Sequence, residues 1–84
     1  MEKGFNTDIH FRGQRFHVQT EDWGFENPFF VSRVYNGGAV IKSVKVPYGE
    51  ILPRGTGSEA PAIRLALELQ HKKILDLLLS GHLL

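Results

Sequence analysis

Apolar and polar side chains alternate along residues 6–12 and again along residues 15–21, and the pair Gly13-Gln14 separates the two runs. A period of two is that of a β-strand, whose side chains point alternately to opposite faces. A pair that begins with glycine suits the tight type II′ turn between neighbouring antiparallel strands. The pattern therefore predicts a β-hairpin over residues 6–21, with one face in the core and the other in solvent.

A two-residue turn at Gly13-Gln14 also predicts which residues face each other across this hairpin. The expected core pairs are Phe11 with Phe16, Ile9 with Val18 and Thr7 with Thr20. The expected solvent pairs are Arg12 with Arg15, His10 with His17, Asp8 with Gln19 and Asn6 with Glu21. Because the solvent face contains no apolar residue, it is the first place to look for ligand-binding groups.

Residues 29–35 and 39–46 predict a second hairpin, since the intervening Asn36-Gly37-Gly38 readily supplies the positive φ of a tight turn. The sequence leaves two possibilities for the register of this hairpin. A two-residue turn places Phe29, Val31 and Tyr35 on the face of Val40, Val44 and Val46, whereas a three-residue loop places Phe30 and Val34 there. Both faces keep apolar residues in either case, so this hairpin is expected to be central or covered on both sides.

Residues 22–28 and 53–57 are predicted connections, because glycine and proline interrupt both stretches. The first connection carries two large rings, Trp23 and Phe25, which are expected to cap the core. The second is expected to be a flexible linker to a C-terminal helix, after residues 47–52 have left the sheet.

The C-terminal helix is predicted from Ser58, a favourable N-cap, to about Ser80, where Gly81 is a typical stop signal. At 100° per residue its apolar side chains form one stripe that can lie on the sheet. The stripe consists of Ile63, Ala66, Leu67, Ile74, Leu77 and Leu78.

Four further leucines project to a different side of this helix: Leu65, Leu69, Leu75 and Leu79. One four-stranded sheet cannot cover two sides of one helix. Leaving these leucines in water forgoes about 1.5–3 kcal/mol each relative to full burial, a large sum for a domain of this size. We therefore predict a partner surface. The alternative is a frayed helix, or a helix packed in a groove between the sheet and a loop.

Together these elements predict a single α+β domain over residues 1–84, in which a four-stranded antiparallel sheet of two consecutive hairpins carries one long C-terminal helix on one face. The 84 residues, 42% of them hydrophobic, are too few for two cores. The absence of cysteine excludes disulfides and thiolate chemistry and fits the cytoplasm. No segment has the apolar length of a signal peptide or a membrane span, so no membrane partner is expected.

The expected opposition of His10 and His17 predicts a possible metal site, because facing strand positions bring Cβ atoms to about 4.5–5.5 Å. Zinc normally takes three or four protein ligands, and the nearest additional candidates are Asp8, Gln19 and Glu21. The alternative is a solvated face. On such a face the two imidazoles would repel each other once acid protonates them.

Arg12 opposite Arg15 would place two like charges at the hairpin tip, an arrangement that an anion between them would relieve. Trp23 is a further candidate for ligand contact, together with the rings of Phe25 and Phe29. The structural alternative is that these rings belong to the core.

A nucleic-acid surface would use the basic strand residues Arg33, Lys42 and Lys45. The rings of Phe11 and Phe16, however, are predicted to point away from the arginines at the hairpin tip. The formal net charge of the chain is only +1. Nucleic acid is therefore not the expected partner.

No pattern of nucleophile, base and orienting group is present, so we expect neither an enzyme nor a cofactor. The leading hypothesis is a non-enzymatic protein-interaction module that forms a homodimer through the second apolar side of its helix. In an alternative version the same helix docks on a different protein. The remaining alternatives are a small accessory domain that binds a metal ion through His10 and His17, or a nucleic acid through its basic strand residues.

Overall fold

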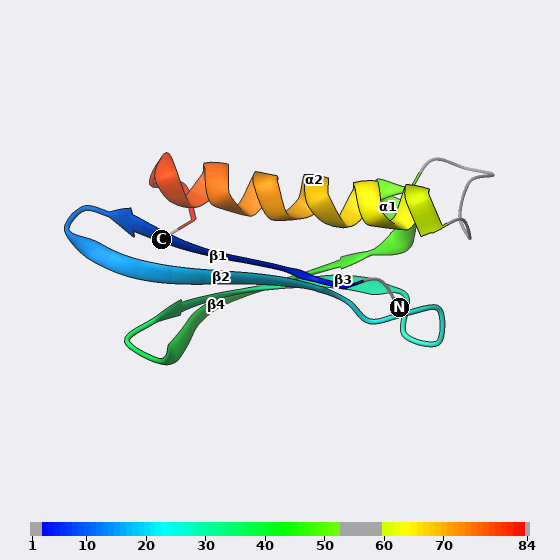
Figure 1. Ribbon diagram of the computed structural model, residues 1–84, viewed down its shortest axis with the longest axis horizontal. Helices are drawn as coiled ribbons and strands as arrows, with labels where there is room; N and C mark the ends of the chain where they lie inside the picture. Colours follow the sequence, from blue (N-terminus) through cyan, green and yellow to red (C-terminus); the bar gives the residue numbers. More distant parts are fainter. Residues whose placement is uncertain (1–2, 53–59, 84) are drawn as a thin grey trace.

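The computed structural model describes residues 3–52 and 60–83 and confirms the predicted α+β architecture. Within these ranges, four strands form one antiparallel sheet in the order β1-β2-β3-β4, and one long helix lies across a face of it (Figure 1). The elements are β1 (Phe5–Phe11), β2 (Gln14–Asp22), β3 (Phe29–Asn36), β4 (Ala39–Pro47), α1 (Tyr48–Ile51) and α2 (Ala60–Leu79). The predicted linker 53–57 and the predicted N-cap Ser58 lie outside the described residues.

The first hairpin turns one residue earlier than predicted. Its central residues are Arg12 and Gly13, with φ values of 52° and 78°, the two left-handed positions of a type I′ turn. The predicted register is therefore wrong by two residues, and Ile9 faces Phe16. Because side chains alternate with a period of two, the residues paired in both registers still lie on their predicted faces, whereas Arg12 now belongs to the turn. The observed register also avoids placing Arg12 opposite Arg15.

The second hairpin combines a two-residue turn with a β-bulge. Gly37 and Gly38 form the turn with φ values of 60° and 82°, and the register shifts between Val34 and Tyr35, so that Ile41 is the extra residue. Beyond the bulge, Phe30, Ser32 and Val34 lie on the same face as Val44 and Val46. The bulge thus puts Phe30 and Val34 on the face of Val44 and Val46, as predicted for a longer loop. Val40, before the bulge, faces Tyr35, as predicted for a two-residue turn.

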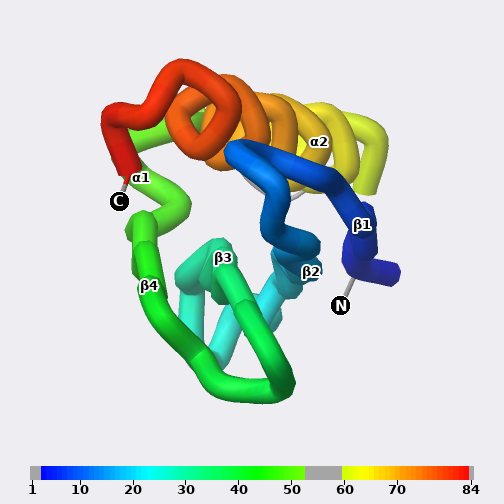
Figure 2. The backbone as a smooth tube through the Cα atoms, turned by 90° about the vertical axis from the view of Figure 1, so that its left-hand side faces the viewer, coloured from blue at the N-terminus to red at the C-terminus, as the bar shows by residue number. Residues whose placement is uncertain are grey.

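The core lies between α2 and the inner face of β1, β2 and β3 (Figure 2). The predicted helix stripe is buried except for Leu77, which is half-buried. One end of the core contains Phe16, Val18, Val34, Ile74 and Leu78, and the other contains Phe30, Tyr48, Ile63, Ala66 and Leu67. In contrast to β3, the edge strand β4 is exposed over residues 39–43, so the expectation of a covered second hairpin holds for β3 alone.

The short helix α1 is not predicted by the sequence, and it brings Tyr48 into the core. The Tyr48 ring stacks on Phe30 with ring centroids 4.7 Å apart. Phe25, which was expected to cap the core, is 59% exposed and lies in a T-shaped contact with the Tyr48 ring. Tyr48 therefore closes this end of the core.

Two leucines of α2 test the orientation of the helix. Leu67 is fully buried and Leu65 is 57% exposed. We expect Leu67→Ala to lower the free energy of unfolding by about 2–5 kcal/mol, because it leaves a cavity. Leu65→Ala should lower it by less than about 1 kcal/mol. Urea denaturation at low protein concentration measures both, and equal losses would contradict this orientation of α2.

Candidate functional site

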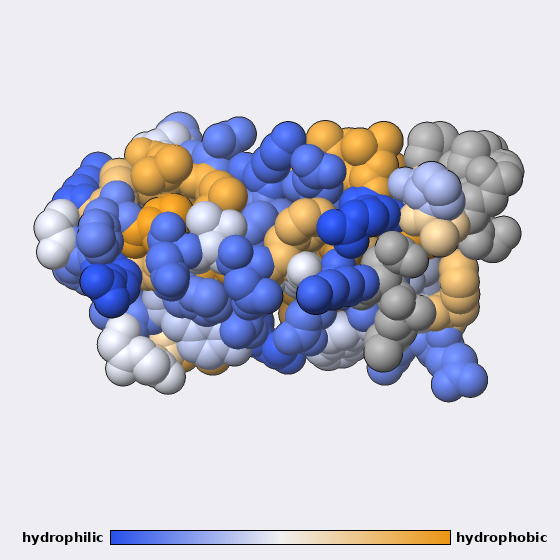
Figure 3. All heavy atoms as spheres, viewed as in Figure 1, coloured by the Kyte–Doolittle hydropathy of each residue, from blue (hydrophilic) through white to orange (hydrophobic). Residues whose placement is uncertain are grey.

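The solvent side of α2 carries three of the four leucines that the sequence singled out. Leu65, Leu69 and Leu79, called here the outward leucines, are 57%, 53% and 50% exposed. Figure 3 shows apolar atoms gathered over the N-terminal half of α2. Leu75 instead packs against the core cluster that contains Ile74 and Leu78. The predicted partner surface therefore consists of the three outward leucines without Leu75. That these leucines contact a partner stays a prediction.

Beneath α2, five buried or half-buried polar side chains form a connected cluster, called here the polar cluster. Its members are Thr7, Thr20, Ser32, Gln70 and His71. The imidazole of His71 makes hydrogen bonds through Nδ1 to Thr20 Oγ1 (2.7 Å) and through Nε2 to Thr7 Oγ1 (2.8 Å). Thr20 also contacts Ser32 Oγ at 2.8 Å. In the described ranges no buried side-chain polar atom lacks a partner, so the cluster is fully satisfied.

The electrostatics of the polar cluster favour a neutral His71. Burial lowers the pKa of this imidazole, and its electrostatic interaction with the His17 side chain lowers it further. The ring of Phe5 stacks on His71 at 5.7 Å between centroids and shields it from solvent. A neutral imidazole with both nitrogens occupied by hydroxyl groups holds α2 on the sheet.

Tyr48 and Asp22 form a second buried contact, at the other end of the sheet. The Tyr48 hydroxyl donates to Asp22 Oδ1, and the backbone N–H of Gly24 donates to the same oxygen at 2.9 Å. Burial and the neighbouring Asp22 carboxylate raise the pKa of the Tyr48 phenol far above neutrality. The phenol therefore stays protonated and ties α1 to the end of β2.

The sheet face away from α2, called here the outer face, carries the histidines expected to bind a metal. His10 faces Arg15 and His17 faces Asp8, so the predicted opposition of His10 and His17 is wrong. Arg15 Nε donates to His10 Nε2 at 3.3 Å, and His17 Nδ1 lies 2.7 Å from Asp8 Oδ1. Among the described residues, no three metal-ligating side chains gather closely enough to hold an ion. The register also removes the predicted repulsion between facing imidazolium ions.

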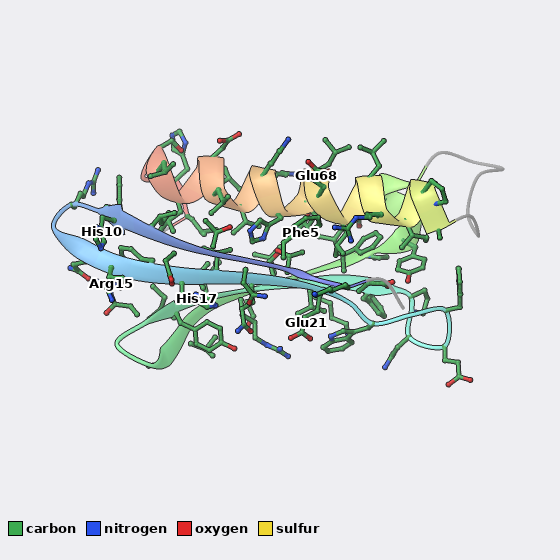
Figure 4. The ribbon with its side chains drawn as sticks, viewed as in Figure 1. Phe5, His10, Arg15, His17, Glu21 and Glu68 are labelled. Atoms are coloured by element: carbon green, nitrogen blue, oxygen red, sulfur yellow. The ribbon has the colours of Figure 1, made fainter. Side chains whose placement is uncertain are left out.

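The structure does not bring together the three residues expected to contact a ligand or anion, Arg12, Arg15 and Trp23. The guanidinium of Arg12 lies over the Phe11 ring at 4.7 Å and packs close to Gly81, beside the end of α2. Arg15 lies on the outer face (Figure 4). Trp23 follows the far end of β2, eight positions from Arg15. Each therefore belongs to a different part of the surface.

Trp23 belongs to a cluster of rings and cations that sequence reasoning missed. Lys45 Nζ lies 4.1 Å from the Phe29 ring centroid and 5.0 Å from that of Trp23. Glu21 accepts a hydrogen bond from the Trp23 indole at 3.3 Å and pairs with Arg33 at 3.6 Å. The Lys45 ammonium group therefore already lies over the rings of Phe29 and Trp23. The Glu21 carboxylate pairs with the neighbouring Arg33. The bulge sets the facing of Lys45, which is why the alternation pattern could not reveal the cluster.

The outer face also contains a hollow of about 470 Å³ near the tip of the second hairpin. The hollow is lined by Arg15, His17, Gln19, Tyr35, Gly37 and Gly38. Two lining residues, Arg15 and His17, were singled out from the sequence, but their grouping with Tyr35 was not predictable, because it depends on the mutual register of the two hairpins.

Comparisons of the chain with protein-family models, curated proteins and solved structures find no match. In the described residues, no helix has the length and apolar character needed to cross a membrane. Any functional assignment must therefore come from the surfaces described above.

The polar cluster predicts that stability decreases in mild acid. Because the pKa of His71 is lowered in the folded state, the unfolded chain takes up a proton first as the pH falls below about 6.5. The free energy of unfolding should then decrease by at most about 1.4 kcal/mol per pH unit down to the folded-state pKa. Urea denaturation between about pH 7.5 and 5 measures this slope.

The matched variants are His71→Gln, which should reduce the slope, and His10→Gln, which removes an exposed histidine instead. An NMR titration of the wild-type imidazoles provides a second readout if His71→Gln folds poorly. A slope unchanged in His71→Gln, or a His71 imidazole that protonates no later than a free histidine, would contradict the prediction.

Proposed function

We propose that this protein is a non-enzymatic interaction module that forms a homodimer through the solvent side of α2. The observation that carries the proposal is the exposure of three large apolar side chains, the outward leucines, along the solvent side of one helix. Exposed apolar area of this kind favours association because burial removes it from water.

The spacing of side chains along α2 fits a helix–helix seam. Leu65, Leu69, Lys72, Asp76 and Leu79 follow one another in alternating steps of four and three residues. This is the spacing of the seam positions in a coiled coil, where each side chain inserts between side chains of the facing helix. The seam therefore contains apolar ends and a charged centre.

An antiparallel pairing of two α2 helices uses the part of this seam from Leu69 to Leu79. When Leu69 of one copy faces Leu79 of the other, Lys72 of the first copy faces Asp76 of the second, and two-fold symmetry repeats both contacts. Two leucine layers then bracket two pairs of opposite charge. This charge complementarity favours a second copy over an unrelated partner. A parallel pairing would place Lys72 against Lys72.

The proposal of a non-enzymatic role rests on the groups available on the outer face. In residues 3–52 and 60–83, the side-chain hydrogen bonds of His17 go to Asp8 and Asn6, so no hydroxyl group is activated by the imidazole. The buried His71 contacts the hydroxyls of Thr7 and Thr20, but this contact lies between α2 and the sheet.

Size-exclusion chromatography with light scattering tests the dimer. We expect the mass of two chains at high micromolar concentration, and the mass of one chain for Leu69→Lys, because the substitution places a charge in an apolar layer. Val40→Lys is the matched control, since Val40 is also 50% exposed but lies on β4. A wild-type monomer would contradict the homodimer and leave only docking on a different protein.

A charge exchange tests the antiparallel register. Lys72→Asp should weaken the dimer by roughly tenfold, because it replaces two attractive contacts with two repulsive ones. The double variant Lys72→Asp with Asp76→Lys restores opposite charges across the seam and should recover most of the affinity. Sedimentation equilibrium measures both constants, and equal weakening in the single and double variants would contradict the register.

A further inference from the structure

The hollow on the outer face is independent of α2. It lies between β2 and the turn of the second hairpin, and two of its lining residues, Arg15 and His17, are labelled in Figure 4 on the side of the sheet away from α2. Its volume of about 470 Å³ lies within the range of small-molecule sites. Because the hollow is open to solvent, any ligand in it is only partly enclosed.

Two rings form adjacent walls of the hollow. The centroids of His17 and Tyr35 are 6.1 Å apart, with an angle of 52° between the ring planes. Side-chain contacts restrain both rings, since Asp8 Oδ1 lies 2.7 Å from His17 Nδ1 and the Tyr35 hydroxyl donates to Gln19 at 3.4 Å. Flat walls in fixed positions suit a flat ligand group.

Arg15 supplies charge at the rim of this aromatic corner. Its Nε donates to His10 Nε2 at 3.3 Å, which orients the guanidinium. In the described part of the chain, the side-chain ion pairs are His17 with Asp8, Arg33 with Glu21 and Lys72 with Glu68, so Arg15 has no carboxylate partner there. Its terminal N–H groups can therefore bind an anion with two parallel hydrogen bonds.

The opposite rim consists of backbone alone. Gly37 and Gly38 adopt positive φ, and apart from each glycine and its two chain neighbours no atom of the described residues lies within 4 Å of the place where a Cβ would project. No side chain of the turn therefore closes the hollow on that side, and a flat ring can enter beside Tyr35.

We propose that the hollow binds a small organic anion in which a flat ring carries a phosphate group. The ring packs against Tyr35 and His17, and the phosphate oxygens accept hydrogen bonds from the terminal N–H groups of Arg15. A dianionic phosphate suits the guanidinium of Arg15 better than a monoanionic carboxylate does, because the larger negative charge strengthens the two charge-assisted hydrogen bonds. The open geometry implies dissociation constants in the millimolar range.

The test is a titration followed by two-dimensional NMR of backbone amides, with phenyl phosphate as the probe. Inorganic phosphate and phenol each supply half of the ligand, and benzoate replaces the phosphate by a carboxylate. We expect phenyl phosphate to bind most tightly of the four and to shift the amides of Tyr35, Gly37 and Gly38. The outcome does not depend on the dimer, because α2 lies on the other face.

Two arginines of the same hairpin provide a matched comparison. Arg15→Gln should weaken phenyl phosphate binding by about fivefold to tenfold, and Arg12→Gln should leave it unchanged, because Arg12 packs on Phe11 beside the end of α2. Tyr35→Leu should weaken phenyl phosphate but not inorganic phosphate. Absence of binding, equal binding of phenyl and inorganic phosphate, tighter binding of benzoate, or equal effects of the two arginine variants would each overturn the proposal.

Discussion

The packing of one amphipathic helix on one face of a single sheet determines which face of the sheet and which side of the helix are exposed to solvent. The sheet has two faces and α2 covers only one of them, across β1, β2 and β3. The helix in turn has more apolar side chains than this contact can bury, since Leu65, Leu69 and Leu79 stay half exposed. The two exposed surfaces, the outward leucines and the outer face, both follow from this single layer contact.

The polar cluster fixes which side of α2 faces solvent. Both ring nitrogens of His71 are bonded to threonine hydroxyls on neighbouring strands, and Gln70 Nε2 approaches Ser32 Oγ at 3.5 Å. Rotating the helix by one position, about 100°, would leave these buried groups without partners. An apolar core alone would tolerate such a rotation more easily, because leucines occupy several sides of α2. The cluster therefore connects core packing to the orientation of the outward leucines.

Side-chain periodicity alone was sufficient for the four strands, the long helix and the faces of the first hairpin's strands, because burial on one face repeats every two residues in strands and every 3.6 in helices. It could not supply the register. A turn at Arg12-Gly13 and a turn at Gly13-Gln14 give the same faces, and the bulge at Ile41 leaves no mark in the alternation of β4. The candidate sites depended on register, so the facing of His10 and His17 and the grouping of Arg12 with Arg15 were wrong. The prediction of the buried side of α2 did not depend on strand register. Of the four leucines expected to project away from the sheet, only Leu75 packs against the core.

The central claim is that α2 pairs with its own copy in an antiparallel register, and contacts between leucine methyl groups test it most directly. In a mixture of isotope-labelled and unlabelled chains, filtered NOE spectra detect only contacts between copies. The account predicts cross-peaks between Leu69 of one copy and Leu79 of the other, which are about 15 Å apart along one helix and beyond the reach of an NOE within a chain. A dimer whose intermolecular cross-peaks come from another surface, such as Val40 and Ile41 on the β4 edge, would contradict it.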